Sequence, residues 1–267
     1  MLYSVALKLS SLDSAPVARP NGYHVYTLLL FLLRRVNPRL AQRLHEMNGP
    51  KPFTTSLLPG RGLPRHGQAL SPRSGDLWLR FTILEDEAFS SLVESVWSLG
   101  QEQPLELGDG RYRCTLLATT PVQSPWACCT PFESLLEDAP DDPRATLRFL
   151  SLTTFRSSGH RNVLFPDPSL VFGSLLARWN AFAPMRLDSS SYTPAFSRIR
   201  PVYYRLRTGA MGFGSYEELG FQGTCAYALD AAEPPELRRA VQALSLFAFY
   251  SGVGVKTAMG MGQCRKM

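Results

Sequence analysis

Near the end of the sequence, four glycines surround a single lysine. Gly252 and Gly254 precede Lys256. Gly260 and Gly262 follow it. Glycine reaches positive φ without a Cβ penalty and lets backbone N–H groups approach an anion closely. A loop of this composition with a central cation is typical of a phosphate contact, whereas the ordinary alternative is a plain turn.

The loop does not fit the common nucleotide-binding patterns. Lys256 follows Val255 rather than the last glycine of a Gly-x-x-x-x-Gly-Lys run. Thr257 stands where a dinucleotide fingerprint needs its third glycine, and too few residues follow for the helix of that pattern. A small-molecule phosphate-binding enzyme is therefore only a remote hypothesis.

The charge of the chain is basic and is carried mainly by arginine. The 267 residues give a net charge of +6, and 24 of the 28 basic residues are arginine. The planar guanidinium binds phosphate through two donors and stacks on unpaired bases, which favours a nucleic-acid partner. A GC-rich genome also favours arginine over lysine, so this bias alone does not decide between the two explanations.

The cysteines indicate a reducing compartment. They form no Cys-x-x-Cys pair and are odd in number, so we expect no disulfide framework and no zinc site. No cofactor is expected. The start of the chain lacks the charged region of a signal peptide, and the apolar run Leu28–Leu33 is too short to span a bilayer. The protein is predicted to be soluble and cytoplasmic. The five cysteines are Cys114, Cys128, Cys129, Cys225 and Cys264.

Hydrophobic periodicity predicts the same element order, β-α-β-β-α-β, in each half of the chain. The first half has predicted strands over 2–9, 51–58, 75–84 and 111–120, and helices over 22–36, from Pro38 to before 48–50, and over 86–98. The second half has predicted strands over 147–155, 202–207 and 223–229 and at the terminus, and helices over 168–182 and 235–250.

This order predicts an α+β fold of two tandem ferredoxin-like, RRM-like domains. The segment 121–143 is rich in Pro, Asp and Ser and is predicted to be a linker with one helical turn at 131–137. The predicted domains are 1–124 and 125–267. Because this fold hosts many functions, it does not assign one by itself.

The segment Leu44–Leu57, with the sequence LHEMNGPKPFTTSL, closely resembles a signature of the Cas6-type CRISPR-associated endoribonucleases. Three further segments resemble the same family in the same order, and the resemblance spans nearly the whole chain. The glycine loop and the first segment are its most specific parts. The further segments are 152–156, 165–168 leading to 178–180, and 247–262.

The resemblance implies metal-independent cutting of precursor CRISPR RNA within its repeats. A ribose 2′-OH attacks the adjacent phosphorus, which leaves 2′,3′-cyclic phosphate and 5′-OH ends. The motif assigns His45 as the acid or base and Lys51 as the cation for the phosphate. His45 lies at a helix C-terminus, where the helix dipole favours imidazolium. The ordinary alternatives are a capping histidine and a solvated lysine at a strand edge.

One position departs from part of the family. Some relatives carry a tyrosine on the first helix that completes a trio with the His and Lys, and the matching position here is Leu30. No hydroxyl can act from Leu30. Tyr26 and His24 lie nearer the helix start and could substitute, although we expect packing or surface roles for them. His66 and His160 lie in Gly- and Arg-rich loops and are candidates for RNA contact rather than catalysis.

For RNA binding, Lys256 in the glycine loop is the predicted phosphate contact, and Arg156 and Arg161 are further candidates. The expected partner is CRISPR repeat RNA, both hairpin and flanks. Other subunits of an effector complex are partners if the protein stays on its product, and monomer and homodimer both fit. The alternative function is a guide-RNA-binding subunit of the same superfamily that does not cut.

Overall fold

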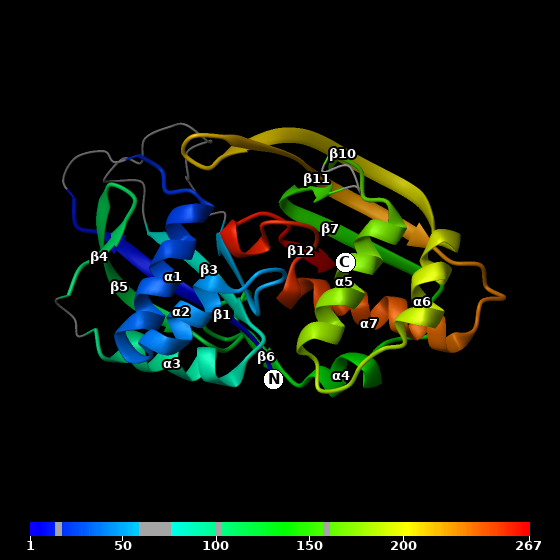
Figure 1. Ribbon diagram of the computed structural model, residues 1–267, viewed down its shortest axis with the longest axis horizontal. Helices are drawn as coiled ribbons and strands as arrows, with labels where there is room; N and C mark the ends of the chain where they lie inside the picture. Colours follow the sequence, from blue (N-terminus) through cyan, green and yellow to red (C-terminus); the bar gives the residue numbers. More distant parts are fainter. Residues whose placement is uncertain (14–17, 59–75, 100–102, 157–160) are drawn as a thin grey trace. The chain divides into compact units, whose positions relative to one another are not determined.

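The computed structural model describes residues 1–13, 18–58, 76–99, 103–156 and 161–267, which excludes His66 and His160 (Figure 1). The chain forms two compact units. Unit 1 consists of Met1–Cys129 and Ala258–Gly260, and unit 2 of Thr130–Thr257 and Met261–Met267.

Among its described residues, unit 1 is an antiparallel sheet covered by helices. The sheet order is β2-β3-β1-β5-β4, and β6 also pairs with β1. The helices α1, α2 and α3 lie over the sheet (Figure 1). The strands are β1 (Leu2–Ser11), β2 (Phe53–Leu57), β3 (Leu77–Ile83), β4 (Leu105–Leu107), β5 (Gly110–Ala118) and β6 (Cys128–Thr130). The helices are α1 (Gly22–Val36), α2 (Pro38–Glu46) and α3 (Asp86–Trp97).

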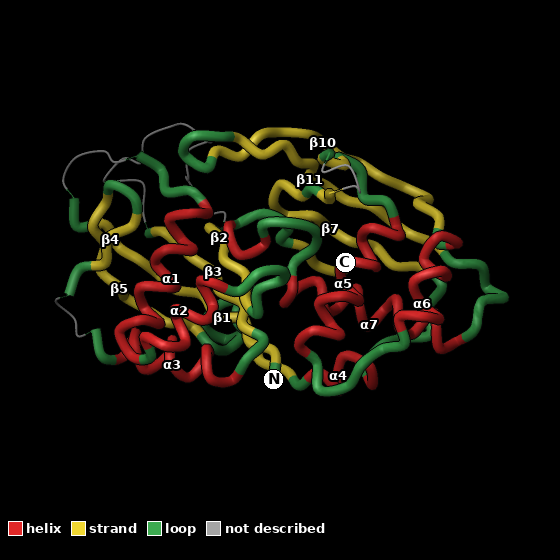
Figure 2. The backbone as a smooth tube through the Cα atoms, viewed as in Figure 1, coloured by secondary structure: helices red, strands yellow, loops and turns green. Residues whose placement is uncertain are grey.

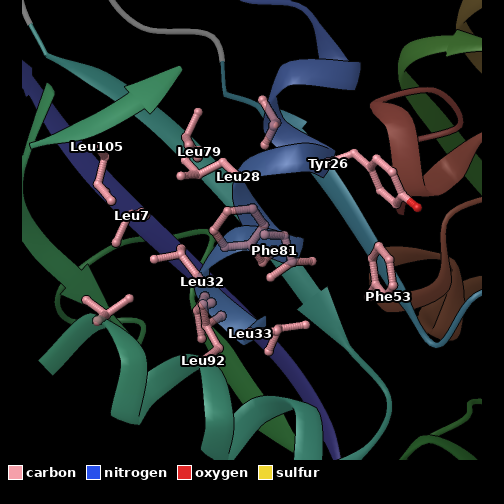
Figure 3. Close-up of a cluster of buried hydrophobic side chains, with 14 of the residues drawn as sticks. Leu7, Tyr26, Leu28, Leu32, Leu33, Phe53, Leu79, Phe81, Leu92 and Leu105 are labelled. Carbon is pink, nitrogen blue, oxygen red and sulfur yellow. The ribbon is translucent and has the colours of Figure 1, made fainter. Parts of the chain in front are cut away.

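The core of unit 1 holds α1 in place against the sheet. Leu7 on the central strand, Phe81 on β3 and Leu32 on α1 are fully buried and point toward one another in Figure 3. Leu92 of α3 closes the same cluster. Burying one such side chain contributes about 1.5–3 kcal/mol, so this packing fixes the position of α1 against the sheet.

Unit 2 repeats the plan with a four-stranded antiparallel sheet in the order β10-β11-β7-β12 (Figure 2). A separate two-stranded sheet joins β8 to β9. The strands are β7 (Arg144–Thr153), β8 (Phe155–Arg156), β9 (Asn162–Val163), β10 (Arg200–Gly212), β11 (Glu217–Ala228) and β12 (Cys264–Lys266). The helices are α4 (Phe132–Glu137), α5 (Pro168–Phe182), α6 (Ser189–Ala195) and α7 (Pro235–Ser251).

The predicted α+β fold of two tandem ferredoxin-like units is confirmed. In unit 1 the series β1, α1, β2, β3, α3, β5 follows the predicted order, and in unit 2 the series is β7, α5, β10, β11, α7, β12. In both sheets the first strand of the series lies between the third and the fourth. No helix in the described part of the chain is both long and apolar enough to cross a bilayer.

Several elements of the structure were not predicted. The segment 121–143 is more than a linker, because it contains β6, which pairs with β1, as well as the expected helical turn, α4. The strands β4, β8 and β9 are too short to display a period. The hairpin β10–β11 extends beyond the predicted 202–207 and 223–229, since its glycines signal turns but lie within a continuous ladder.

Candidate active site

The helix α2 presents the predicted catalytic histidine at its C-terminal end. The Asn37 side chain caps the helix start by accepting a hydrogen bond from the Leu40 amide at 3.0 Å, and Pro38 occupies the first turn. Leu40 and Leu44 are buried against the core. His45 follows Leu44 on the flank of that stripe, so its ring is exposed.

A tyrosine hydroxyl lies beside the histidine ring. The Tyr26 hydroxyl lies 3.0 Å from Nδ1 of His45, and the Tyr26 side chain is almost wholly buried and stacks near Phe53. Burial and the neighbouring Tyr23 raise the pKa of the Tyr26 hydroxyl above 10, so it stays protonated at neutral pH. Within the described residues, Nε2 of His45 has no hydrogen-bond partner. The exposed nitrogen is therefore the one available for a substrate.

This contact corrects the expectation for the first helix. Leu30 does pack against the core, as its apolar position indicates. Tyr26, however, lies one turn earlier on the same side of α1, and its longer side chain reaches His45. Tyr26 is thus more than a packing residue. His24 instead helps to cap α1, because its Nδ1 accepts a hydrogen bond from the Asn21 amide at 3.2 Å.

Lys51 lies at the same helix end but is turned toward backbone. Its ammonium donates to the carbonyl oxygens of Leu44 at 2.5 Å, His45 at 3.0 Å and Met47 at 3.1 Å. These are carbonyls that the end of a helix leaves unpaired, and the helix dipole favours a cation there. Burial lowers the pKa of the Lys51 ammonium. The structure therefore brings Lys51 to the backbone of His45, with all three ammonium protons engaged.

The glycine loop has the backbone that its sequence predicts. Gly252, Gly254, Gly260 and Gly262 all have positive φ, from 65° to 90°, and Lys256 also has positive φ, at 55°. A Cβ on Gly254 would lie 2.3 Å from the Thr154 carbonyl oxygen, which explains why glycine is required there.

Several amides of this loop are already paired within unit 2. The Gly252 amide donates to Ala248, and the Val253 amide to the Gly262 carbonyl at 2.8 Å. The Val255 amide donates to the Thr154 carbonyl at 3.1 Å. These amides hold residues 252–255 of the loop within unit 2, so a phosphate would be bound there mainly by side chains.

Two predicted RNA-binding residues meet at one buried carboxylate. Glu218, whose side chain is only 6% exposed, accepts from Lys256 at 3.1 Å and from Arg156 at 3.1 Å. Asn162 donates to the same carboxylate at 2.6 Å. Burial alone raises the pKa of Glu218, but the bonds from Asn162, Lys256 and Arg156 outweigh it and lower that pKa. Arg161 is exposed just before β9.

The tip of the β10–β11 hairpin encloses the Lys256 ammonium. Its nitrogen lies 4.5 Å from the ring centre of Phe213 and 4.2 Å from that of Tyr216, and it donates to the Tyr216 hydroxyl. These distances are typical of cation–π contacts. Lys256 is therefore held by two aromatic rings and a carboxylate, and its side chain is only 19% exposed.

Both units match one protein family. Residues 1–137 match the Cas6 N-terminal domain, and residues 147–264 match the CRISPR-associated endoribonuclease Cas6. The chain belongs to the Cas6 family. The predicted resemblance is thereby confirmed over nearly the whole chain.

Solved Cas6 structures share the fold over the full length. A Cas6 product complex is 33% identical, with a TM-score of 0.85 and complete coverage of both chains. A Thermus thermophilus Cas6 is 32% identical with a TM-score of 0.78, and the match covers all of this chain and 98% of that one. A Cas6 from Mycobacterium tuberculosis is 27% identical over 135 residues, which cover 50% of this chain and 42% of the relative. The chain thus aligns with less than half of that protein.

The residues that surround Lys256 and Arg156 were not predicted from the sequence. Glu218, Asn162, Phe213 and Tyr216 belong to no local motif. The positions of Glu218 and Arg156 are 62 residues apart, and only the pairing of β11 within the sheet brings them together. The signal available in the sequence was a pair of aromatic residues around a glycine turn, which is also typical of an ordinary hairpin.

Proposed function

We propose that this protein is a metal-independent endoribonuclease that cuts precursor CRISPR RNA within its repeats. The observation that carries the proposal is the contact between Tyr26 and His45. The Tyr26 hydroxyl binds Nδ1 of the imidazole and leaves Nε2 exposed. Membership of the Cas6 family supports RNA as the substrate. The same ring geometry suits proton transfer to or from a bound ribose or phosphate.

In the proposed reaction, a ribose 2′-oxygen attacks the adjacent phosphorus and the bond from phosphorus to the 5′-oxygen breaks. The 2′-OH loses a proton and the 5′-oxygen gains one, which leaves 2′,3′-cyclic phosphate and 5′-OH ends. We assign the proton on Nε2 of His45 to the leaving oxygen. Before this transfer, the imidazolium form donates its Nδ1–H to the Tyr26 hydroxyl, and this bond remains when Nε2 has lost its proton.

Lys51 has a positioning role in this proposal. Its three bonds fix the carbonyls of Leu44, His45 and Met47, and so set where the His45 side chain leaves the helix. The positive charge also lies close to the site where negative charge develops on the phosphate, and it favours that charge at short range. Direct contact with the phosphate requires one of the three carbonyl bonds to be exchanged.

The RNA is proposed to be repeat RNA, held in part by Lys256, Arg156 and Arg161 near the glycine loop. A related Cas6 was solved with its product and another with a substrate mimic, which supports binding of RNA by this fold. Retention of the product as guide RNA, within an effector complex in the cytoplasm, belongs to the same proposal. One observation favours the alternative, a binding subunit that does not cut: the Lys51 ammonium is fully engaged by backbone.

The test is cleavage of the cognate repeat RNA in EDTA, with a matched RNA that carries one 2′-deoxy sugar at the cut site. We expect cutting of the first RNA, no cutting of the second, and cyclic phosphate at the new 3′ end. Cutting of the 2′-deoxy RNA would contradict the proposed attack. Tight binding of both RNAs without any cutting would support the guide-RNA-binding subunit instead.

A further inference from the structure

The four-stranded sheet of unit 2 has one face covered by helices. Leu147, Phe149, Cys225 and Tyr227 point to this face and are buried. The ring of Phe172 on α5 lies 5.3 Å from that of Tyr227, edge to face. Because successive residues of a strand point to opposite faces, the residues between these belong to the other face of the sheet.

That other face carries a row of arginines across the strands. In the register of the sheet, Arg205 of β10 pairs with Thr224 of β11, Thr224 with Arg148 of β7, and Arg148 with Arg265 of β12. Neighbouring strands lie about 4.8 Å apart, so Arg148 and Arg265 are directly opposed like charges, which is an unfavourable arrangement. An anion placed over the row would relieve it.

No acidic residue offsets this charge from within the four strand segments. The segments 146–150, 203–207, 222–226 and 264–266 contain no Asp or Glu. In the part of the chain that the structure describes, neither Arg148 nor Arg205 forms an ion pair, and both are exposed. The charges of Arg148 and Arg205 are therefore available to a partner.

Planar groups flank the row on the same face. Tyr203 precedes Arg205 by two residues and is 56% exposed, and Arg207 follows by two. With the Gln222 amide turned so that its oxygen faces Arg207, Nε of Arg207 donates to that oxygen at 2.6 Å, which holds the guanidinium against the sheet. We name the surface formed by Tyr203, Arg205, Arg207, Arg148 and Arg265 the arginine face.

We propose that the arginine face binds a single-stranded segment of the RNA. This rests on the proposed function, because the segment is taken to be a flank of the repeat hairpin. Unpaired bases stack on tyrosine rings and guanidinium planes, and arginine binds phosphate with two parallel donors. A duplex keeps its bases stacked inside and offers Tyr203 nothing to stack on. Gln222 and Thr224 add side-chain amide and hydroxyl groups beside the arginines.

Adjacent tyrosines of β10 give a matched pair for the test. Tyr203 and Tyr204 are 56% and 58% exposed, but Tyr204 belongs to the opposite face, where its ring packs edge-on against Phe165 at 5.4 Å. The full chain with Tyr203→Ala, Arg205→Gln or Tyr204→Ala would be titrated with repeat RNA carrying its flanks, with the hairpin alone, and with an eight-nucleotide oligouridylate. Circular dichroism of each variant would establish that it is folded.

We expect Tyr203→Ala to weaken binding of the flanked RNA and the oligouridylate by about tenfold, the usual effect of losing one stacked base. Arg205→Gln should lower the salt dependence of binding by about one phosphate contact. Binding of the hairpin alone, and the effect of Tyr204→Ala, should stay near wild type.

Equal losses for Tyr203→Ala and Tyr204→Ala would overturn the proposal, as would a loss confined to the hairpin alone. Unchanged binding of all three RNAs by both face variants would also overturn it and leave the surface to a protein partner. If no variant and no wild-type protein cuts RNA, while the flank-specific loss is still observed, the proposed function fails and the arginine face stands.

Discussion

The Tyr26 hydroxyl lies 3.0 Å from Nδ1 of His45, and this bond joins a buried helix to an exposed ring. The core of unit 1 fixes Tyr26, so the bond restricts how the imidazole can rotate. An orienting partner on one nitrogen determines which proton the other nitrogen can give or take. The pair thereby connects the packing of α1 to the chemistry proposed for α2.

Replacing Tyr26 with phenylalanine should slow cleavage without loosening the fold. The variant Tyr26→Phe keeps the ring beside Phe53 but removes the partner of His45. We expect a single-turnover rate about 10–150-fold lower, as for loss of one hydrogen bond to a charged group, and a shifted pH profile. Tyr23→Phe, on the exposed side of α1, is the control. An unchanged pH profile in Tyr26→Phe would contradict the orienting role.

Replacing His45 with alanine should nearly abolish cleavage. We expect the rate to fall by about 10²–10⁴-fold, the usual contribution of a general acid or base, with little change in RNA affinity. Gln42→Ala is the control, because Gln42 is exposed on the same helix and, among the described residues, its side chain bonds only to Glu46. Normal cleavage by His45→Ala would remove the histidine from the mechanism.

Replacing Lys51 with methionine should lower stability and activity together. Lys51→Met removes three bonds to the carbonyls that end α2. A hydrogen bond to a charged group makes a net contribution of about 1.5–3 kcal/mol, which solvent screening reduces at a partly exposed side chain. Urea unfolding and single-turnover cleavage measure the two effects. A large loss of activity at unchanged stability would instead indicate that the ammonium acts directly on the phosphate.

A structural feature could be predicted from the sequence where the residues that determine it lie within one short segment. The helix carrying His45 was predictable, because Asn37, Pro38 and the Leu40–Leu44 stripe lie within one short segment. The partner Tyr26 was not, because matching by motif selected Leu30 and no periodicity shows which tyrosine reaches a ring 19 positions away.

The arrangement around the glycine loop was harder to predict. The loop itself and its lysine were evident from composition, but Glu218 reaches Lys256 only through the fold of β11. A buried carboxylate that pairs two predicted RNA-binding cations leaves no local pattern. The short strands β4 and β6 were not predicted, because three residues are too few to show the alternation of a strand.

Substituting a loop glycine should disturb folding before it disturbs RNA contact. Gly254→Ala places a Cβ 2.3 Å from the Thr154 carbonyl oxygen at a φ of 79°, so we expect a loss of about 1–3 kcal/mol in the free energy of unfolding. Gly173→Ala is the control, because nothing lies within 4 Å of its Cβ in α5, where alanine gains up to about 1 kcal/mol. Equal stability of both variants would contradict the strained-loop account.

Glu218 should make part of the stability of unit 2 depend on pH. The bonds from Asn162, Lys256 and Arg156 outweigh the opposing effect of burial and lower the pKa of this carboxyl below its ordinary 4.5. Since the folded pKa is the lower one, the stabilisation is fully present above about pH 4.5 and is lost as the pH falls through the folded pKa.

Glu218→Gln removes this titration but keeps the shape of the side chain. Urea unfolding should therefore show wild type more stable than Glu218→Gln by about 1–3 kcal/mol at pH 7, with the difference shrinking below pH 4.5. Glu217→Gln, at the exposed neighbouring position, should match wild type. A difference that stays constant down to pH 3 would mean that the carboxylate charge does not hold Lys256 and Arg156, and that their positions are set by the aromatic rings and the backbone instead.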